Sequence, residues 1–534
     1  MFGAQWMRIN LNITSNYMDI QPADLSTPRN SRRTHWTRFH TLALIATALC
    51  ALLVMIDIQR PSYWLDEKIS VDIASPPTLQ QVVANVISGE RRPPAYHLSL
   101  WLWTHIISSD ERIIRLHSAI WAILLIPAAY QLGRRFTDKK GAALTAFVAA
   151  LAPVTISYGQ TVRYYTMVAA LSTLSLVLFL DVIRKPDKCK PWLLYIATTL
   201  LLLYTDYPAY GVVIAQNILA FVWWVQNRRS PAYHPRWRWI WAQAIMAIVV
   251  ALWIPVVLQQ SGRDFGAADL SNSIAGALLR IAYPLYAWLV GETLFPWTPL
   301  AILGAVAGCM LLIVGFIRLK RSNRFTWIVA FGLPFIVSQI LLSTVATDSP
   351  FVNAPARSMA CVALIFILVS IGLAAVRQRW LQVLVAGVIV AGHIAALVNY
   401  YRGVDFINTV YNTPARETAQ TIAASAHAGD VTVTESDSMV DLYLPASLHQ
   451  THFFSDDVDG IKEYLTMHPQ AQVWQVIMGR DRTRNQVSTD LAEWLQTRHT
   501  LMSTTGFAEQ DAAYRAVKSR LIGREAYRFR LTLD

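Results

Sequence analysis

The sequence predicts a mainly α-helical, polytopic membrane protein with about 11 transmembrane helices and a small α/β soluble domain at its C-terminus. Hydrophobic residues make up 54% of the 534 residues and charged residues only 15%, whereas soluble chains carry about 45–50% and about 25%. Both departures indicate that a lipid bilayer is the main solvent of the chain. They exclude a disordered protein, a disulfide scaffold and an ordinary soluble enzyme.

Apolar runs of about 20 residues, the length that crosses about 30 Å of hydrocarbon, recur along the first three quarters of the chain. Eleven such runs lie at residues 39–58, 113–132, 141–157, 165–183, 191–205, 209–226, 238–258, 297–317, 325–345, 356–376 and 380–400. They divide the chain into a polar N-terminal segment at 1–37, a membrane domain at 38–401 and a soluble tail at 402–534.

The net charge of +12 is unevenly spread and predicts the orientation of the spans. Residues 402–534 hold 13 Lys/Arg and 17 Asp/Glu, a net charge of −4, so residues 1–401 carry +16. Of the 33 Lys/Arg in residues 1–401, 21 stand in short clusters in every second connection: Arg32/Arg33/Arg38, Arg134/Arg135/Lys139/Lys140, Arg184/Lys185/Lys188/Lys190, Arg228/Arg229/Arg236/Arg238, Arg318/Lys320/Arg321/Arg324 and Arg377/Arg379. Such clusters are typical of cytoplasmic loops. We therefore expect a multi-pass protein of the plasma (inner) membrane, with a cytoplasmic N-terminus and an extracytoplasmic tail. A basic face for nucleic acid is not indicated.

Two further apolar segments cannot cross the membrane if this alternation holds. Residues 93–107 and 273–290 are rich in Trp and Tyr and are interrupted by Pro, His or Arg, which is typical of helices at the membrane interface. Residues 76–89 predict a third helix, capped by Ser75 and started by Pro76. The outer loops 59–111 and 259–296 are therefore long and structured, and chemistry is expected where they meet.

The tail alternates stretches typical of helices with stretches typical of strands. Residues 414–428, 461–467 and 485–497 predict helices, whereas residues 431–435, 473–478 and 527–533 predict strands. This pattern indicates a small α/β domain.

The first candidate site residues are Asp66 and Glu67, directly after the first span. A solvated turn or an acidic cap on a following helix would explain a bare Asp-Glu pair. A carboxylate at this surface can also act as a general base that takes a proton from an acceptor hydroxyl. We assign both residues as catalytic candidates.

The second group lies in the same loop, in the segment Glu90-Arg91-Arg92-Pro93-Pro94-Ala95-Tyr96-His97. Arg92 can snorkel to lipid headgroups, or it can bind a phosphate with its planar donor fork. Tyr96 and His97 follow immediately and are assigned as substrate-binding candidates.

The third group lies on the side of the membrane that is poor in positive charge. Arg163, next to Tyr164, is a lone cation at the end of a span, and such a residue is a functional candidate by default. An interfacial anchor of Arg with Tyr is the alternative. Arg357 stands at the start of the tenth span. We assign Arg92, Arg163 and Arg357 as phosphate-binding and Tyr164 as substrate-binding.

A metal site is not predicted from the ligand spacing. His97, His105 and His117 show no ligand pattern around them, and the four cysteines form no C-x-x-C pair. Asp66 and Glu67 could hold a divalent ion, but no full ligand set stands beside them. We expect no cofactor.

The order of these motifs carries a resemblance. After the first span come W-x-D-E (64–67), an amphipathic helix, a basic residue before Pro-Pro, Arg115 at the start of a span, Gly-Arg-Arg (133–135) and A-P-x-x-I-x-Y-x-Q-x-x-R-Y-Y (152–165). This order resembles bacterial members of the C-fold glycosyltransferases, which are similar to protein O-mannosyltransferases and to the lipid A aminoarabinose transferase. The resemblance covers about residues 38–400 and is most specific between 60 and 170.

The resemblance implies a polyprenyl-phosphate-linked monosaccharide as donor and a reaction on the non-cytoplasmic face. The acidic residue of the family falls on Asp66, and its Arg-Tyr pair falls on Arg163 and Tyr164. Arg92 stands where the family usually has His or Lys, so the positive charge of Lys is kept. The acceptor would be a hydroxyl of a glycan, lipid or protein, and membrane lipids would be partners.

Two other classes of protein remain as alternatives. A multi-span lipid or solute transporter or flippase would also have intramembrane charges, but repeated halves and helices broken near the midplane are not evident. A membrane scaffold with a partner-binding tail would leave the segment of Arg92 and the position of Arg163 unexplained.

Overall fold

The computed structural model describes residues 38–531 except 91, 185–186, 227–235, 262–273, 343–352, 409–410, 436–437, 479–485 and 507–523. The predicted segment 1–37 lies outside the described residues. The chain divides into two compact units. The span unit comprises Met1–Ile56, Pro76–Gly291 and Pro299–Ile394, and the tail unit comprises Asp57–Ser75, Glu292–Thr298 and Ala395–Asp534.

All eleven predicted spans are helical in the described part of the chain. Seven helices there are long and apolar enough to cross a membrane, and the number rises to nine if each of two bent pairs is one span. The seven are α1 (Arg38–Met55), α5 (Glu111–Phe136), α8 (Tyr165–Arg184), α10 (Tyr210–Gln226, extended by the turn Tyr207–Ala209), α14 (Pro299–Arg318), α15 (Arg321–Leu342) and α18 (Arg379–Arg402).

The remaining four predicted spans are bent or short. The pair α6 (Lys139–Leu151) and α7 (Pro153–Gln160) bends by 50°, and the pair α11 (Arg236–Ala251) and α12 (Ile254–Ser261) bends by 48°. Pro153 explains the first bend, because proline cannot donate to the preceding turn and begins a new helix. The short helices are α9 (Cys189–Leu203) and Met359–Ala375, which contains α17 (Val362–Ala375).

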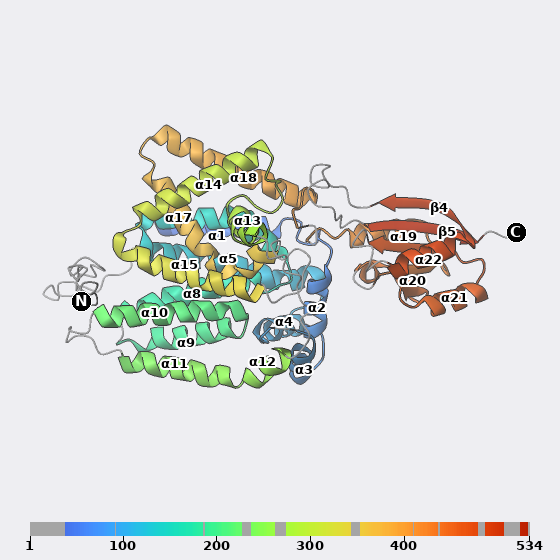
Figure 1. Cartoon of the computed structure of the whole chain (residues 1–534), viewed down its shortest axis with the longest axis horizontal. Coiled ribbons are helices and arrows are strands. Elements are labelled where there is room, and N and C mark those ends of the chain that lie inside the picture. The colour runs from blue at the N-terminus through green and yellow to red at the C-terminus, as the bar shows by residue number, and fades with distance from the viewer. Residues whose placement is uncertain are drawn as a thin grey trace, which may run out of the picture. The chain divides into compact units, whose positions relative to one another are not determined.

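The span helices pack tightly inside and expose apolar side chains outside. Residues 362–372 of α17 are buried without a break, whereas Leu52, Met310 and Ile313 are about 60% exposed. A Cβ added at Gly315 of α14 or at Gly372 of α17 would collide with a backbone carbonyl of the facing helix, so these two helices cross closely. Figure 1 shows α9, α10 and α11 running side by side in the same bundle.

The predicted interfacial segments are also helical. They form α3 (Leu79–Gly89), α4 (Ala95–Ile106) and α13 (Ile274–Leu289), and a further helix, α2 (Leu65–Ala74), follows the first span. The predicted start of α3 is wrong. Thr78 caps it by accepting a hydrogen bond from the backbone of Gln81, because Ser75 already serves as the C-cap of α2.

The tail forms the predicted α/β domain. Its helices and strands are α19 (Ala415–Ser425), β1 (Val431–Thr434), α20 (Ala446–His449), β2 (His452–Phe454), α21 (Val458–Met467), β3 (Val473–Met478), α22 (Gln486–Gln496), β4 (His499–Gly506) and β5 (Arg524–Leu531). The strand order is β2-β1-β3-β5-β4. β1 pairs in parallel with β2 and β3, whereas β5 is antiparallel to β3 and β4.

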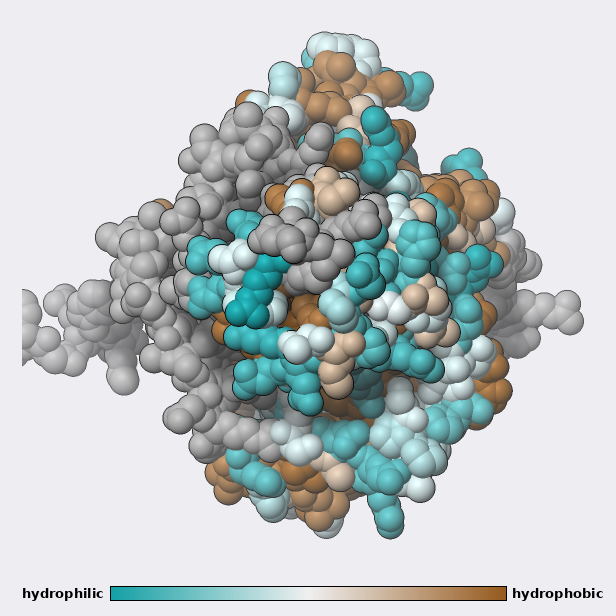
Figure 2. All heavy atoms as spheres, turned by 90° about the vertical axis from the view of Figure 1, so that its right-hand side faces the viewer, coloured by the Kyte–Doolittle hydropathy of each residue, from teal (hydrophilic) through white to brown (hydrophobic). Residues whose placement is uncertain are grey.

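The described part of this sheet buries apolar side chains on both faces. Ile422 of α19 packs in one cluster with Trp474, and Ile461 of α21 packs in another with Val433. β2 and β4 were not predicted, because β2 has three residues and β4 does not alternate apolar with polar residues. Figure 2, turned by 90° from Figure 1, shows a face whose coloured surface at the centre is mostly hydrophilic.

Candidate active site

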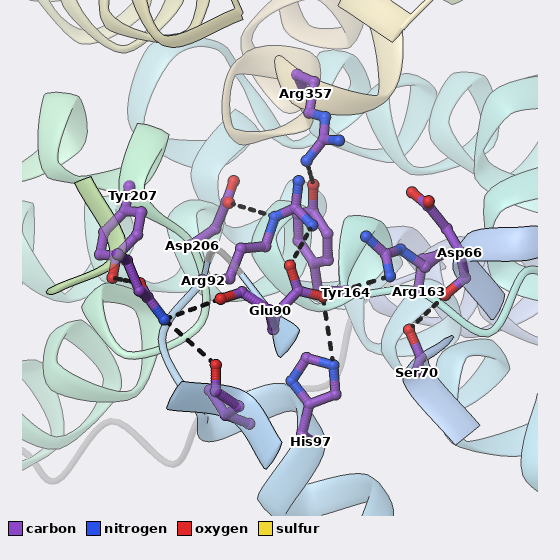
Figure 3. Close-up of polar contacts among 12 residues, drawn as sticks. Asp66, Ser70, Glu90, Arg92, His97, Arg163, Tyr164, Asp206, Tyr207 and Arg357 are labelled. Atoms are coloured by element: carbon purple, nitrogen blue, oxygen red, sulfur yellow. Dashed lines mark hydrogen bonds and ion pairs between the residues drawn. The ribbon is translucent and has the colours of Figure 1, made fainter. Parts of the chain in front are cut away.

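A buried cluster of ion pairs gathers at the ends of several helices of the span unit (Figure 3). The guanidinium of Arg92 donates from Nη1 to Glu90 Oε1 and from Nε to Asp206 Oδ1, both at 3.3 Å. Arg163 Nη1 lies 3.7 Å from the second oxygen of Glu90. The four side chains are no more than 11% exposed. Glu90 therefore holds Arg92 and Arg163 together.

Tyr164 lies among three arginines in the same cluster. The guanidinium carbons of Arg92, Arg163 and Arg357 lie 4.3, 5.4 and 5.9 Å from the centroid of its ring. Arg357 Nη1 also donates to the Tyr164 hydroxyl at 2.5 Å. The structure thus brings the three predicted phosphate-binding arginines and one predicted substrate-binding residue into one place, although they come from three separate segments of the chain. Their role in binding stays a prediction.

His97 and Tyr96 lie on the α4 side of this cluster. His97 Nε2 is 3.7 Å from Glu90 Oε2. Burial lowers the pKa of His97 to about 4, against the opposing effect of Glu90, so the ring is neutral at pH 7. The Tyr96 hydroxyl lies 3.4 Å from Ser118 Oγ, which in turn donates to the backbone carbonyl of Arg163. Tyr96 thereby supports the arginine segment.

Arg92 lies in the short connection between α3 and α4, and the two helices fix its position. α3 ends at Gly89, its C-cap Glu90 has an extended backbone, and Pro93 and Pro94 keep the chain out of a helix until α4 begins. The first amide of α4, that of Ala95, donates to the carbonyl of Tyr204 at 2.8 Å. Because Tyr204 directly follows α9, this bond brings Arg92 to Asp206.

The segment of Arg163 is anchored by Gln160 at the end of α7. The Gln160 side chain donates to the carbonyls of Val54 and Ile56 at the end of α1, and its own carbonyl accepts from Arg115. A Cβ at Gly159 would lie within 3 Å of side chains of α1 and α5, so only glycine allows this close approach.

Burial and charge shift the pKa values of the connecting residues in opposite directions. Burial raises the pKa of Asp206 to about 7, although Arg92 opposes the shift. Burial lowers the pKa of Arg92, but Tyr164, Glu90 and Asp206 outweigh it and leave that pKa above its ordinary value. Arg92 and Arg163 therefore face Glu90 and Asp206, and Asp206 can take up a proton near neutral pH.

Sequence reasoning missed Glu90, Asp206 and Gln260 as members of this site. Gln260 Nε2 donates to the carbonyls of Glu90 and Val86, and Gln260 Oε1 accepts from the Tyr207 hydroxyl. Asp206 could have been found from the sequence, because it is a lone acidic residue between two apolar runs. A lone charge at the end of a span is the same feature that identified Arg163. Glu90 belongs to the segment 90–97 that the sequence analysis singled out, but no function was predicted for it.

Asp66 and Glu67 belong to the tail unit and occupy the first turn of α2. Glu67 is 2% exposed, and its carboxylate accepts from the backbone amide of Trp64 at 3.3 Å at the start of α2. The structure thus gives Glu67 a capping contact, and its catalytic role stays a prediction. Asp66 is half-buried, and its carbonyl accepts from Ser70 Oγ (Figure 3). Within the described residues, no group of three His, Cys, Asp or Glu side chains could hold a metal ion.

Comparisons with known proteins agree with the motif order. The structure of ArnT from Cupriavidus metallidurans in the apo state is similar over 92% of this chain and 98% of that chain, with 12% identity and a TM-score of 0.51. The chain has the fold of the C-fold membrane glycosyltransferases. The predicted resemblance in fold is thereby confirmed, because this likeness extends over nearly the whole length of both chains.

Within this C-fold chain, residues 91–257 match the model of a family described as dolichyl-phosphate-mannose-protein mannosyltransferase. The matched range contains Arg92, Arg163 and Asp206. The Archaeoglobus fulgidus oligosaccharyltransferase tethered with an acceptor peptide matches over 85% of this chain and 72% of that chain, with 12% identity and a TM-score of 0.43. No curated protein matches the chain by sequence.

Proposed function

We propose that this chain transfers a monosaccharide from a polyprenyl-phosphate donor to an acceptor hydroxyl on the outer face of the membrane. The observation that carries the proposal is the buried cluster in which Arg92, Arg163 and Arg357 surround Tyr164. Guanidinium groups that lie together in a largely buried site can bind an anionic group such as a phosphate with charge-assisted hydrogen bonds. The match of residues 91–257 to a family of lipid-phosphate-sugar transferases supports the same donor class.

The proposed reaction needs cations that bind the leaving phosphate and a base that accepts the proton of the acceptor hydroxyl. As the glycosidic bond breaks, negative charge develops on the leaving phosphate, and fixed guanidinium groups stabilise it. The acceptor hydroxyl is a poor nucleophile, and a carboxylate that takes its proton makes it a better one. We assign that role to Asp66, the acidic residue nearest the first span, with Glu67 beside it as the helper that accepts from the Trp64 amide. A single displacement of this kind inverts the anomeric carbon.

Binding of undecaprenyl phosphate to the purified full chain in nanodiscs tests the proposal, with uncharged undecaprenol for comparison. Wild type should bind the phosphate and not the alcohol, and Arg163→Ala should lose most of that binding. Arg135→Ala is the matched control, because Arg135 lies in the last turn of α5, away from the cluster, and pairs with Asp181 of α8. Equal binding of both lipids, or full binding by Arg163→Ala, would contradict the proposal.

The transporter alternative predicts binding without bond cleavage. Incubation with a panel of polyprenyl-phosphate hexoses and pentoses plus crude acceptor should release free polyprenyl phosphate, which mass spectrometry detects. A chain that moves these lipids across the bilayer and releases no polyprenyl phosphate from any of them would be a transporter.

A further inference from the structure

Arg357 stands at a break in the tenth predicted span, and polar side chains of two neighbouring helices hold this break. The short helix α16 (Ala354–Arg357) is followed by Ser358, by the 3-10 turn Met359–Cys361 and then by α17. Apart from Arg357, all residues from 354 to 361 are buried. A broken helix leaves polar groups without the partners that a regular helix supplies, so in a buried segment other parts of the chain must supply them.

The hydroxyl of Ser358, the residue after Arg357, makes two hydrogen bonds to α15. Ser358 Oγ lies 2.7 Å from Ser338 Oγ, and it accepts from Gln339 Nε2 at 3.0 Å. Ser338 also reaches the carbonyl of Phe335 at 2.7 Å and can donate to it. Because a hydroxyl has one hydrogen, the arrangement that satisfies all these groups has Ser358 donating to Ser338. The Ser358 hydroxyl then both donates and accepts, which fixes its position on α15.

A second helix, α8, holds the same break two residues further on. Ser172 Oγ shares its hydrogen between the carbonyl of Ala360, at 3.0 Å, and that of Ala169 in its own helix, at 3.1 Å. α8 begins directly after Tyr164, whose hydroxyl accepts from Arg357 Nη1 (Figure 3). The backbone that carries Arg357 is therefore attached to α15 on one side of the break and to α8 on the other.

We propose that Ser338 and Gln339 are positioning residues for the proposed transfer. Acting through Ser358, they hold the backbone from which Arg357 extends, so that its guanidinium stays beside Tyr164 and the lipid phosphate. This inference rests on the proposed function. An arginine side chain has many rotamers, and a donor stabilises the charge of a leaving phosphate best when it is fixed in place beforehand.

A purely structural role of these side chains predicts a different pattern of effects. Polar contacts between membrane helices commonly stabilise a bundle, and the loss of such a contact would add to the effect of any other mutation. A positioning residue acts through Arg357, so its loss has no further consequence once that guanidinium is gone. A double-mutant cycle distinguishes the two cases, because changes that act through one another are not additive.

The test is a double-mutant cycle of Ser358→Ala and Arg357→Ala in the full chain in nanodiscs, with the Kd for undecaprenyl phosphate as the measured quantity. Ser358→Ala alone should raise Kd about two- to tenfold, the range that one lost hydrogen bond gives. In the Arg357→Ala background, Ser358→Ala should cause no further rise. Gln339→Met keeps the length of the side chain and removes its amide. It should repeat both results, and it carries the test if Ser358→Ala does not fold.

Ser370→Ala is the matched control, because Ser370 is a buried serine of α17 whose hydroxyl donates to the carbonyl of Phe366 in its own helix. It should keep the wild-type Kd. The inference is overturned, and the proposed function left standing, if Ser358→Ala and Gln339→Met bind as wild type does. The same holds if they raise Kd by an equal factor with and without Arg357. A wild type that does not bind undecaprenyl phosphate would instead refute the proposed function, and the inference with it.

Discussion

The two halves of the first long outer loop, residues 59–75 and 76–111, are held in place by different parts of the chain. The half that carries Asp66 belongs to the tail unit, and the half that carries Arg92 belongs to the span unit. One continuous loop thus supplies the proposed base and the proposed phosphate ligand, but each depends on its own set of neighbours.

Contacts with the tail hold the first half. The amide of Tyr63 donates to the Tyr443 hydroxyl at 2.9 Å, and Ser62 Oγ accepts from the amide of Arg416 at 3.0 Å. The Arg416 guanidinium also lies 4.4 Å from the Tyr443 ring centroid. These are local, partly buried contacts on the segment just before α2.

Ion pairs and backbone bonds of the span bundle hold the second half. Besides the pairs of Arg92, the indole of Trp101 donates to the carbonyl of Pro76 and that of Trp103 to the carbonyl of Ile113. We therefore expect mutations in one half of the loop to affect sugar transfer and mutations in the other half to affect donor binding. The first half should affect kcat, and the second should affect lipid phosphate affinity.

The largest effect is expected from Asp66→Asn, which keeps the shape of the side chain and removes its basicity. Loss of a general base typically lowers the rate by about 10²–10⁴-fold, while undecaprenyl phosphate should bind as in wild type. Transfer kinetics and Kd on the same preparation measure both. Glu67→Gln should keep most of the rate, because an amide oxygen can still accept from Trp64. A dead Glu67→Gln beside an active Asp66→Asn would reverse the assignment.

The next largest effect is expected from Arg357→Ala in the span unit. It removes a donor to the Tyr164 hydroxyl and one of three cations around that ring, so both kcat and lipid phosphate affinity should fall by about 10- to 100-fold. Arg318→Ala, an exposed arginine in the last turn of α14, is the control. Unchanged affinity in Arg357→Ala would remove Arg357 from the phosphate site.

The elements of the span unit were predictable because a bilayer imposes one simple rule, a long apolar run for each crossing. The cluster was only partly predictable. A lone arginine such as Arg163 is conspicuous in sequence, but its pairing with Glu90 joins segments more than 70 residues apart, and periodicity carries no such information. The start of α3 was predicted wrongly at Ser75, because the same residue types can stand at either end of a helix. Ser75 is the C-cap of α2, and α3 begins after Thr78.

A smaller effect on the second half is expected from Gln260→Leu. Its amide donates to the carbonyls of Glu90 and Val86, and carbonyls left without a partner cost about 1–3 kcal/mol. The Kd for undecaprenyl phosphate should rise about tenfold, while kcat at saturating donor changes little. Gln243→Leu removes a glutamine of α11 whose hydrogen bonds go to Asn217 and Tyr195 instead, and it should leave Kd unchanged. Equal Kd shifts in both variants would indicate a general loss of packing.

The smallest effect is expected from Tyr443→Phe, which removes the hydroxyl that accepts from the Tyr63 amide and keeps the ring under Arg416. A hydrogen bond of this kind contributes about 0.5–1.5 kcal/mol, so kcat should fall about two- to tenfold as the segment before Asp66 loosens. The Kd for undecaprenyl phosphate should not change, because the ion pairs of Arg92 and Arg163 lie in the span unit. Tyr464→Phe, in α21 with its ring against Phe453, is the matched control and should retain wild-type kcat. If Tyr443→Phe instead weakens lipid phosphate binding and leaves kcat intact, the two halves of the loop are not separable and the comparison fails.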